Sequence, residues 1–267
     1  MYLCPLCQQA LVLNNKQYQC VNRHSFDQAK EGYVNLLPVQ QKNSQDPGDN
    51  KEMMQARRAF LQADWYRPMA EQVGALLQPL QAAKLLDLGC GEGYYSHLLQ
   101  QQLTLEEQHG IDISKSAIRS AAKQYPQVHF AVASAYSLPF AAGYFDAIVR
   151  IYAPSLASEL SRVLKVGGHL LTVTPAPEHL LQLKQAIYSE VRLHSDAVTE
   201  ITHFQHVTRE RLSFQLTQLT ATDLMQLITM VPLGWKFSAA VKAELLAQAP
   251  AIQCDFYLDL YQKVAAA

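Results

Sequence analysis

The stretch Leu86-Asp87-Leu88-Gly89-Cys90-Gly91-Glu92-Gly93-Tyr94 decides the fold that this sequence predicts. An apolar run leads into it and a helical pattern follows it, so its glycines belong to a turn between a strand and a helix. Glycine lets the backbone approach a ligand closely, and the helix that begins after the turn favours polar or anionic ligand atoms. The stretch is therefore typical of the ligand-binding turn of an α/β domain.

Asp112 sharpens this interpretation, because it ends the next predicted strand, nineteen residues after Gly93. A carboxylate at that point can accept hydrogen bonds from the two hydroxyls of a ribose. A glycine-rich loop alone would be weak evidence, but the loop and the acid together suit an adenosine-type cofactor. We therefore expect Gly89, Gly91, Gly93 and Asp112 to bind one.

Short apolar runs alternate with helical patterns beyond the loop, which is the signature of βαβ units and a mostly parallel sheet. The strands that we predict are Ala83–Leu88, Gln108–Ile113, Val128–Ala133, Phe145–Tyr152, His169–Thr174 and Ile252–Leu260. The predicted helices include Lys51–Leu61, Lys115–Gln124 with Ser114 as its N-cap, and Ser155–Val166 before the Gly167-Gly168 turn. The chain then divides into a small module at residues 1–40, a linker and helix at 41–66, and an α/β domain at 67–267. An insertion near residues 196–237 has no securely predicted place.

The first module carries a metal-binding pattern, Cys4-x2-Cys7-x12-Cys20-x3-His24. A tetrahedral zinc ion takes four thiolate or imidazole ligands, and a Cys-x2-Cys turn presents two of them to one ion. Four protein ligands leave no open position for water. We therefore expect one structural, non-catalytic zinc ion per chain.

Composition narrows the class of protein further. Hydrophobic residues make up 49% and charged residues 17% of the 267 residues, which excludes a disordered or highly charged chain. The 22 Lys/Arg and 23 Asp/Glu give a net charge of −1, so no overall positive field points to nucleic acid. No apolar run reaches 18 residues, and the first residues lack the features of a signal peptide. The expectation is a soluble, cytoplasmic protein.

The acid-led loop resembles motif I of class I S-adenosylmethionine-dependent methyltransferases. The stretches Ser137–Phe140, Phe145–Ile148 and Leu164–Leu170 resemble the later motifs of that family, in the same order. The resemblance implies a Rossmann-like domain with a mostly parallel seven-stranded sheet. It also implies that Gly89, Gly91 and Glu92 line the methionine end of the cofactor, that Asp87 supports the loop, and that Asp112 holds the ribose.

With a zinc-ribbon-like module before this domain, nearly the whole chain resembles the bacterial 23S ribosomal RNA guanine-N1 methyltransferases of the RlmA/RrmA type. Asp27-x2-Lys30-Glu31-Gly32-Tyr33 and Asp46-Pro47-Gly48-Asp49 are among the residues that carry the similarity. By that resemblance Cys4, Cys7, Cys20 and His24 match zinc ligands, and Tyr66, Gly91, Glu92 and His179 match cofactor-binding positions. The resemblance further implies a homodimer that modifies a guanine in a hairpin loop of 23S rRNA.

The sequence offers fewer candidates for residues that contact the guanine that receives the methyl group. Tyr152 lies at the carboxyl end of the fourth predicted strand, where it would either stack a flipped base or belong to the core. Arg150, on the same strand, is either a donor to a base edge or an ion-pair partner. Guanine N1 carries a proton that something must accept, and the candidates are Asp46 and Asp49, in a Pro-Gly segment, or water.

Five cations near the linker, Lys42, Lys51, Arg57, Arg58 and Arg67, would either follow an RNA phosphate backbone or cover solvated helix faces. Two other functions fit parts of the pattern. A methyltransferase for a small molecule such as a quinone would share the loop, but it would have no use for a zinc module. A binding protein without activity would also fit the fold.

Overall fold

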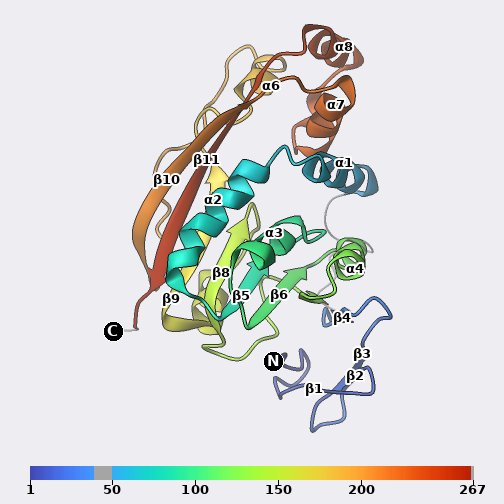
Figure 1. The fold of residues 1–267 in the computed structure, drawn as a ribbon, viewed down its shortest axis with the longest axis vertical. Coiled ribbons are helices and arrows are strands. Elements are labelled where there is room, and N and C mark those ends of the chain that lie inside the picture. The colour runs from blue at the N-terminus through green and yellow to red at the C-terminus, as the bar shows by residue number, and fades with distance from the viewer. Residues whose placement is uncertain (39–49, 266–267) are drawn as a thin grey trace.

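The computed structural model describes residues 1–38 and 50–265 and consists of a small β module and a larger α/β domain (Figure 1). The module is a three-stranded antiparallel sheet of β1 (Val12–Asn14), β2 (Gln17–Gln19) and β3 (Ser25–Asp27). Asn15 and Lys16 form the turn between β1 and β2 with φ of 46° and 63°. Asparagine tolerates this left-handed conformation better than most residues.

The larger sheet runs in the order β10-β11-β9-β8-β5-β6-β7-β4. Its strands are β4 (Val34–Asn35), β5 (Lys84–Leu88), β6 (Glu107–Asp112), β7 (His129–Val132), β8 (Phe145–Ile151), β9 (Leu164–Pro175), β10 (Phe204–Leu216) and β11 (Ile252–Lys263). Neighbours from β4 to β9 pair in parallel, whereas β11 pairs antiparallel with β9 and β10. The mostly parallel sheet is confirmed. Seven of its strands come from the α/β domain, and β4, from the chain segment predicted as the zinc module, adds an eighth.

The helix and strand boundaries predicted around the Gly167-Gly168 turn were wrong. The helix expected over Ser155–Val166 is the shorter α5 (Ala157–Val163), and β9 begins at Leu164, before the glycine pair. Leu164 pairs with Phe145 of β8, so the ladder begins there, and the register shifts before the pairing of Ala147 with His169. Gly167, with φ of 78°, lies in this irregular part of the strand and does not precede it.

The helices are α1 (Lys51–Gln62), α2 (Arg67–Leu77), α3 (Tyr94–Gln102), α4 (Lys115–Gln124), α5, α6 (Leu181–Gln185), α7 (Ala221–Met230) and α8 (Ala239–Gln248). In Figure 1, α2 and α3 lie over one face of the sheet, and α1, α7 and α8 gather beyond one end of it. The Ser114 hydroxyl accepts a hydrogen bond from the Ala117 N–H, which confirms the predicted cap of α4. Within the described residues, no helix is both long and apolar enough to cross a membrane.

The insertion near residues 196–237 contributes one strand to the main sheet and one α-helix that lies outside it. It supplies the edge strand β10 and the helix α7, which packs against α1. On β10, Arg209 and Arg211 form ion pairs with Asp259 and Asp255 of the neighbouring β11. These pairs neutralise two carboxylates that are almost completely buried.

The strand order reverses beside β5, with β6 and β7 on one side and β8 and β9 on the other. Leu85, Leu86 and Leu88 of β5 are fully buried and anchor this strand in the core. In open α/β sheets ligands bind outside the carboxyl ends of the strands at such a reversal. The glycine-rich loop follows β5 directly and therefore lies at the expected binding position.

Candidate cofactor and metal sites

The four predicted zinc ligands come together in the module. The ligand atoms of Cys4, Cys7, Cys20 and His24 all lie within 4.8 Å of one another. The Sγ atoms of Cys7 and Cys20 are 3.6 Å apart, and His24 Nδ1 is 3.5 Å from the Sγ atoms of Cys4 and of Cys20. Zinc bonds of about 2.0–2.3 Å place tetrahedral ligands roughly 3.5–3.8 Å apart, so the cluster fits a zinc ion.

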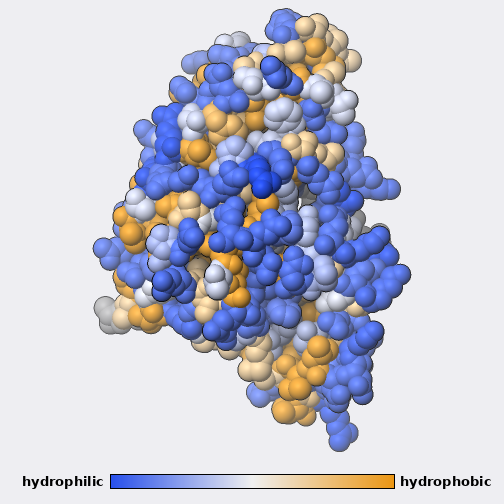
Figure 2. All heavy atoms as spheres, viewed as in Figure 1, coloured by the Kyte–Doolittle hydropathy of each residue, from blue (hydrophilic) through white to orange (hydrophobic). Residues whose placement is uncertain are grey.

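The module also needs such an ion. Leu11 is buried, but Leu6, Val12, Leu13 and Val21 are between 46% and 81% exposed. Figure 2 shows hydrophobic atoms gathered at this end of the molecule, over β1–β3. The buried residues Tyr2, Leu11, Val34 and Leu36 pack in a cluster shared with the α/β domain, so the module has little apolar core of its own to offset the conformational entropy of folding. The metal therefore supplies folding energy.

The glycine-rich loop turns sharply against its neighbours. The N–H groups of Gly89 and Cys90 both donate to the Ile111 carbonyl, at 2.9 and 3.0 Å. Gly89 has φ of 77°, and a Cβ atom there would lie 2.5 Å from the Ala153 Cβ, so the end of β8 abuts the loop. Gly91 has φ of 54° and faces open space, which leaves room for a ligand against the backbone.

Asp112 lies beside this loop, as predicted. One carboxylate oxygen accepts a hydrogen bond from the Gly91 N–H at 3.0 Å, and the other accepts one from the Ser114 N–H at 2.8 Å. The carboxylate thus connects the loop to the start of α4. Carboxylate oxygens have further lone pairs, so these bonds leave acceptor capacity for ribose hydroxyls.

Asp87 is buried beneath the loop and accepts a hydrogen bond of 2.5 Å from the Ser96 hydroxyl. Burial raises the pKa of Asp87 to about 7, and the nearby Asp112 carboxylate adds to this rise, while the bonds from Ser96 oppose it. Ser96 is in the first turn of α3, which Gly93 precedes. Asp87 therefore supports the helix that follows the loop.

Glu92 forms a bidentate ion pair with Arg58 of α1, and Arg58 also donates to the Ser120 hydroxyl at 2.9 Å. The other linker arginines have partners as well: Arg57 donates to the Met230 carbonyl, and Arg67 pairs with Asp64 and Glu71. The structure therefore uses these three cations within the chain. Lys42 lies outside the described residues.

An aromatic cluster lies beside the carboxyl ends of β8 and β9. Phe256 of β11 is at its centre, with ring centroids of Tyr66, Tyr152 and His179 at 5.4, 6.4 and 4.7 Å. His179 Nδ1 accepts a hydrogen bond from the Asp255 N–H, which leaves Nε2 to carry the proton, 3.5 Å from the Tyr152 hydroxyl. Burial lowers the pKa of His179 to about 3, so this neutral form is the one present at physiological pH.

Comparison with known proteins agrees with both sites. The family model for the RlmA N-terminal zinc ribbon matches residues 2–45, and a methyltransferase-domain model matches residues 85–168. A 23S rRNA (guanine(748)-N(1))-methyltransferase of Streptomyces fradiae is 32% identical over 93% of this chain and 91% of its own length. YxjB of Bacillus subtilis, a provisional 23S rRNA guanine-N1 methyltransferase, is 31% identical over 88% of this chain and 87% of its own.

The chain belongs to the RlmA-type family of 23S rRNA guanine-N1 methyltransferases. The resemblance inferred from the sequence motifs is thus confirmed, as is the Rossmann-like domain of the class I methyltransferases.

In this RlmA-type chain, the residues predicted to contact the guanine base or accept its proton differ in their surroundings. Tyr152 follows β8 with φ of 54°, and about half of its surface is exposed. Arg150 donates to the Ser155 hydroxyl at 2.9 Å, and burial lowers its pKa. The described residues offer Arg150 no ion-pair partner, so the ion-pair interpretation is not supported there. Asp46 and Asp49 lie outside the described residues.

Sequence reasoning missed the roles of three residues at the candidate cofactor site. Ser96 holds Asp87, Arg58 holds Glu92, and Phe256 is the centre of the aromatic cluster. An acid inside a cofactor loop, such as Glu92, needs a compensating cation. The neighbouring arginines Arg57 and Arg58 were therefore a sequence signal for the role of Arg58. Phe256 lies in a predicted strand, but nothing in its local pattern distinguishes it from an ordinary core residue.

Proposed function

We propose that this chain transfers a methyl group from S-adenosylmethionine to N1 of a guanine in a hairpin loop of 23S rRNA. The observation that carries the proposal is the contact between Gly89 and Ala153. It brings the half-exposed Tyr152, a candidate platform for the base, next to the cofactor loop. The full-length similarity to named 23S rRNA guanine-N1 methyltransferases supports the choice of substrate.

Eight residues would bind the cofactor. They are Tyr66, Asp87, Gly89, Gly91, Glu92, Gly93, Asp112 and His179. Asp112 would accept hydrogen bonds from the ribose, and Gly91 would let the methionine end approach the backbone. The Nε2–H of neutral His179 is a hydrogen-bond donor that adds no charge beside a cationic sulfonium. Tyr66, buried against Phe256, would close the apolar side.

The bound cofactor supplies a methyl group on a positively charged sulfur. The protein has to hold guanine N1 in line with that methyl group and exclude water. Stacking on Tyr152 would fix the plane of the flipped base, a contact worth about 1–3 kcal/mol. As the N1–methyl bond forms and the sulfur–methyl bond breaks, the N1 proton leaves to Asp46, Asp49 or water.

The zinc ion has a structural role in this proposal. Its four protein ligands leave no position for substrate, and the module joins the main sheet through β4. We further propose that the protein acts as a cytoplasmic homodimer, in line with the family resemblance. Sedimentation equilibrium at micromolar concentration tests the oligomeric state.

The deciding experiment uses purified protein, radiolabelled S-adenosylmethionine and an unmodified 23S rRNA transcript. A methyl group on N1 blocks the pairing edge of guanine, so reverse transcription should stop at one hairpin guanine. The Asp112→Ala variant serves as the control and should give a much weaker stop. Absence of a stop with the wild type, together with methylation of a quinone, would favour the small-molecule alternative.

A further inference from the structure

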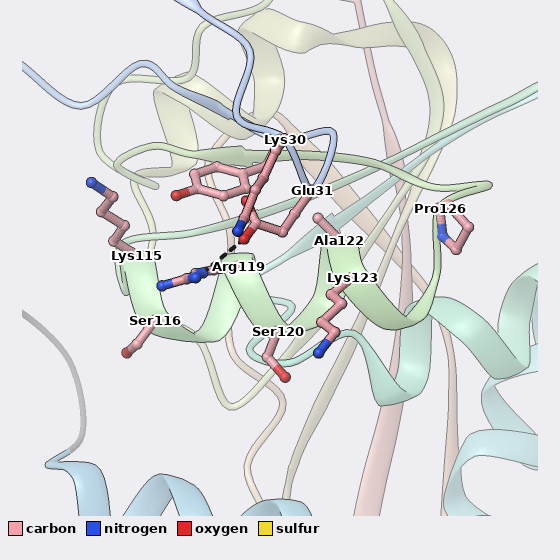
Figure 3. A pocket seen from close by; sticks show the side chains of 10 residues that line it. Lys30, Glu31, Lys115, Ser116, Arg119, Ser120, Ala122, Lys123 and Pro126 are labelled. Carbon is pink, nitrogen blue, oxygen red and sulfur yellow. Dashed lines mark hydrogen bonds and ion pairs between the residues drawn. The ribbon is translucent and has the colours of Figure 1, made fainter.

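A basic groove separates the zinc module from α4. Its volume is about 1100 Å³, and it is lined on the module side by Lys30 and Glu31 and on the α4 side by Lys115, Arg119 and Lys123. Figure 3 shows Lys115 and Lys123 projecting in different directions from different turns of α4, with Lys30 of the module reaching toward the middle of the helix, beside the Glu31–Arg119 pair. None of these residues takes part in the cofactor or zinc sites described above.

One acid lies among the four cations of this groove, so most of their positive charge is uncompensated. Glu31 is paired with Arg119 at 2.9 Å, and its side chain is only 10% exposed. Lys30, Lys115 and Lys123 are exposed and have no ion-pair or hydrogen-bond partner among the described residues. Four cations and one acid give the groove a charge of +3, in a chain whose net charge is −1. Such a concentration of free positive charge fits a polyanion.

The two walls of the groove are fixed relative to each other. Tyr33 of the module packs in one apolar cluster with Ile118 and Ala121 of α4. Two residues after Tyr33 in the chain, Asn35 of β4 pairs with Val132 of β7. Because the module is anchored in this way, the backbone that carries Lys30 is fixed relative to α4. A strand with regularly spaced phosphates can contact both walls without ordering either of them first.

The groove also adjoins the cofactor loop. Ser120, which lines it, accepts the hydrogen bond from Arg58 that accompanies the Arg58–Glu92 ion pair. At the N-terminal end of α4, the Ser114 N–H donates to Asp112. Phosphates bound along α4 would therefore lie next to the elements that hold the cofactor.

We propose that this groove binds the phosphate backbone of the RNA substrate, with Lys115 and Lys123 of α4 and Lys30 of the module as the contacts. The inference rests on the proposed function, which it deepens by placing the RNA on the enzyme. It also gives the zinc module a defined task, because the ion holds the fold that presents Lys30.

The test measures binding of an unmodified 23S rRNA transcript over a range of salt concentrations. The double variant Lys115→Gln, Lys123→Gln should bind roughly 10- to 30-fold more weakly at 0.15 M salt, with a salt slope lower by about 1.4–1.8, as expected for two lost phosphate contacts. Lys30→Gln alone should lower the slope by about 0.7–0.9. The affinity for S-adenosylmethionine should stay at the wild-type value in both variants.

The matched control is the double variant Arg192→Gln, Lys242→Gln, which removes the same charge outside the groove. It should keep the wild-type salt slope. The groove is not the RNA site if the groove variants keep the wild-type salt slope, or if the control double variant loses as much RNA affinity as they do. If the wild type methylates no rRNA at all, the proposed function fails, and the role of the groove fails with it.

Discussion

Arg58 and Glu92 form a bidentate ion pair that joins α1 to the cofactor loop, across 34 residues of sequence. The Glu92 side chain is 15% exposed and that of Arg58 is 40% exposed. Without Arg58 the carboxylate would stay beside the cofactor position with no cation to compensate it. The pair therefore couples the position of α1 to the loop that is proposed to hold the methionine end.

Replacing Arg58 should weaken cofactor binding. In Arg58→Gln we expect the dissociation constant for S-adenosylmethionine to rise about three- to tenfold, a modest change because Arg58 is partly solvated. Calorimetric titration measures it. Arg67→Gln is the matched control, since Arg67 pairs with Asp64 and Glu71 on the surface, and it should stay within twofold of the wild type. Unchanged cofactor affinity in Arg58→Gln, with a lower RNA salt slope, would instead make Arg58 a phosphate contact.

Asp112 should matter for the loop as well as for the ribose. Asp112→Ala removes the acceptor for the Gly91 and Ser114 N–H groups, so we expect binding of S-adenosylmethionine to weaken by about 1.5–3 kcal/mol. Asp112→Asn keeps one acceptor oxygen and should lose less. Calorimetry on variants with native circular dichroism tests this. A dissociation constant within twofold of the wild type in Asp112→Ala would show that another residue holds the ribose.

Removing one zinc ligand should unfold the module more than the α/β domain. Cys7→Ala should contain much less than one zinc ion per chain, whereas Cys254→Ala, which alters a buried cysteine remote from the cluster, should keep one. Elemental analysis of the purified proteins measures the content. Because the cofactor loop belongs to the other domain, Cys7→Ala should keep most of its cofactor affinity while RNA methylation falls. Zinc content equal to the wild type would contradict the ligand assignment.

The sequence predicted those parts of the sites that depend on local patterns. The turn after β5, the Ser114 cap and the four zinc ligands each combine a residue type with a short spacing, and physical chemistry assigns such combinations one structure. The strand β10 escaped prediction because Arg209 and Arg211 make its alternating pattern look solvated. Their partners, Asp259 and Asp255, lie 50 and 44 residues away along the chain.

The same reason explains why Glu92 was assigned to the cofactor without its partner. A sequence gives the sign of each charge but not which charges form pairs. From the sequence alone, Arg58 was equally consistent with a phosphate contact and with a solvated surface cation. Lys30, Lys115 and Lys123 are a similar case. They are scattered along the chain, and only the packing of Tyr33 against α4 brings them to one groove.

The buried His179 should make the protein sensitive to acid. Its pKa in the folded state is about 3, whereas an unfolded histidine has a pKa of about 6.5. Between these values the unfolded chain binds a proton that the folded protein does not bind. His179 therefore has no effect on stability above about pH 6.5 and costs stability progressively as the pH falls toward 3.

His179→Gln removes this titration and keeps an acceptor for the Asp255 N–H. Between pH 6 and 4, its free energy of unfolding should fall less steeply than that of the wild type, by about 1.4 kcal/mol per pH unit. Urea denaturation at a series of pH values measures both slopes. Some dependence will remain because burial also lowers the pKa of His109, to about 4. His203→Gln, at an exposed position, serves as the control. Equal slopes for His179→Gln and the wild type would mean that His179 is protonated in the folded state, and its Nε2–H would then belong to a cation and not to the neutral donor that the cofactor site requires.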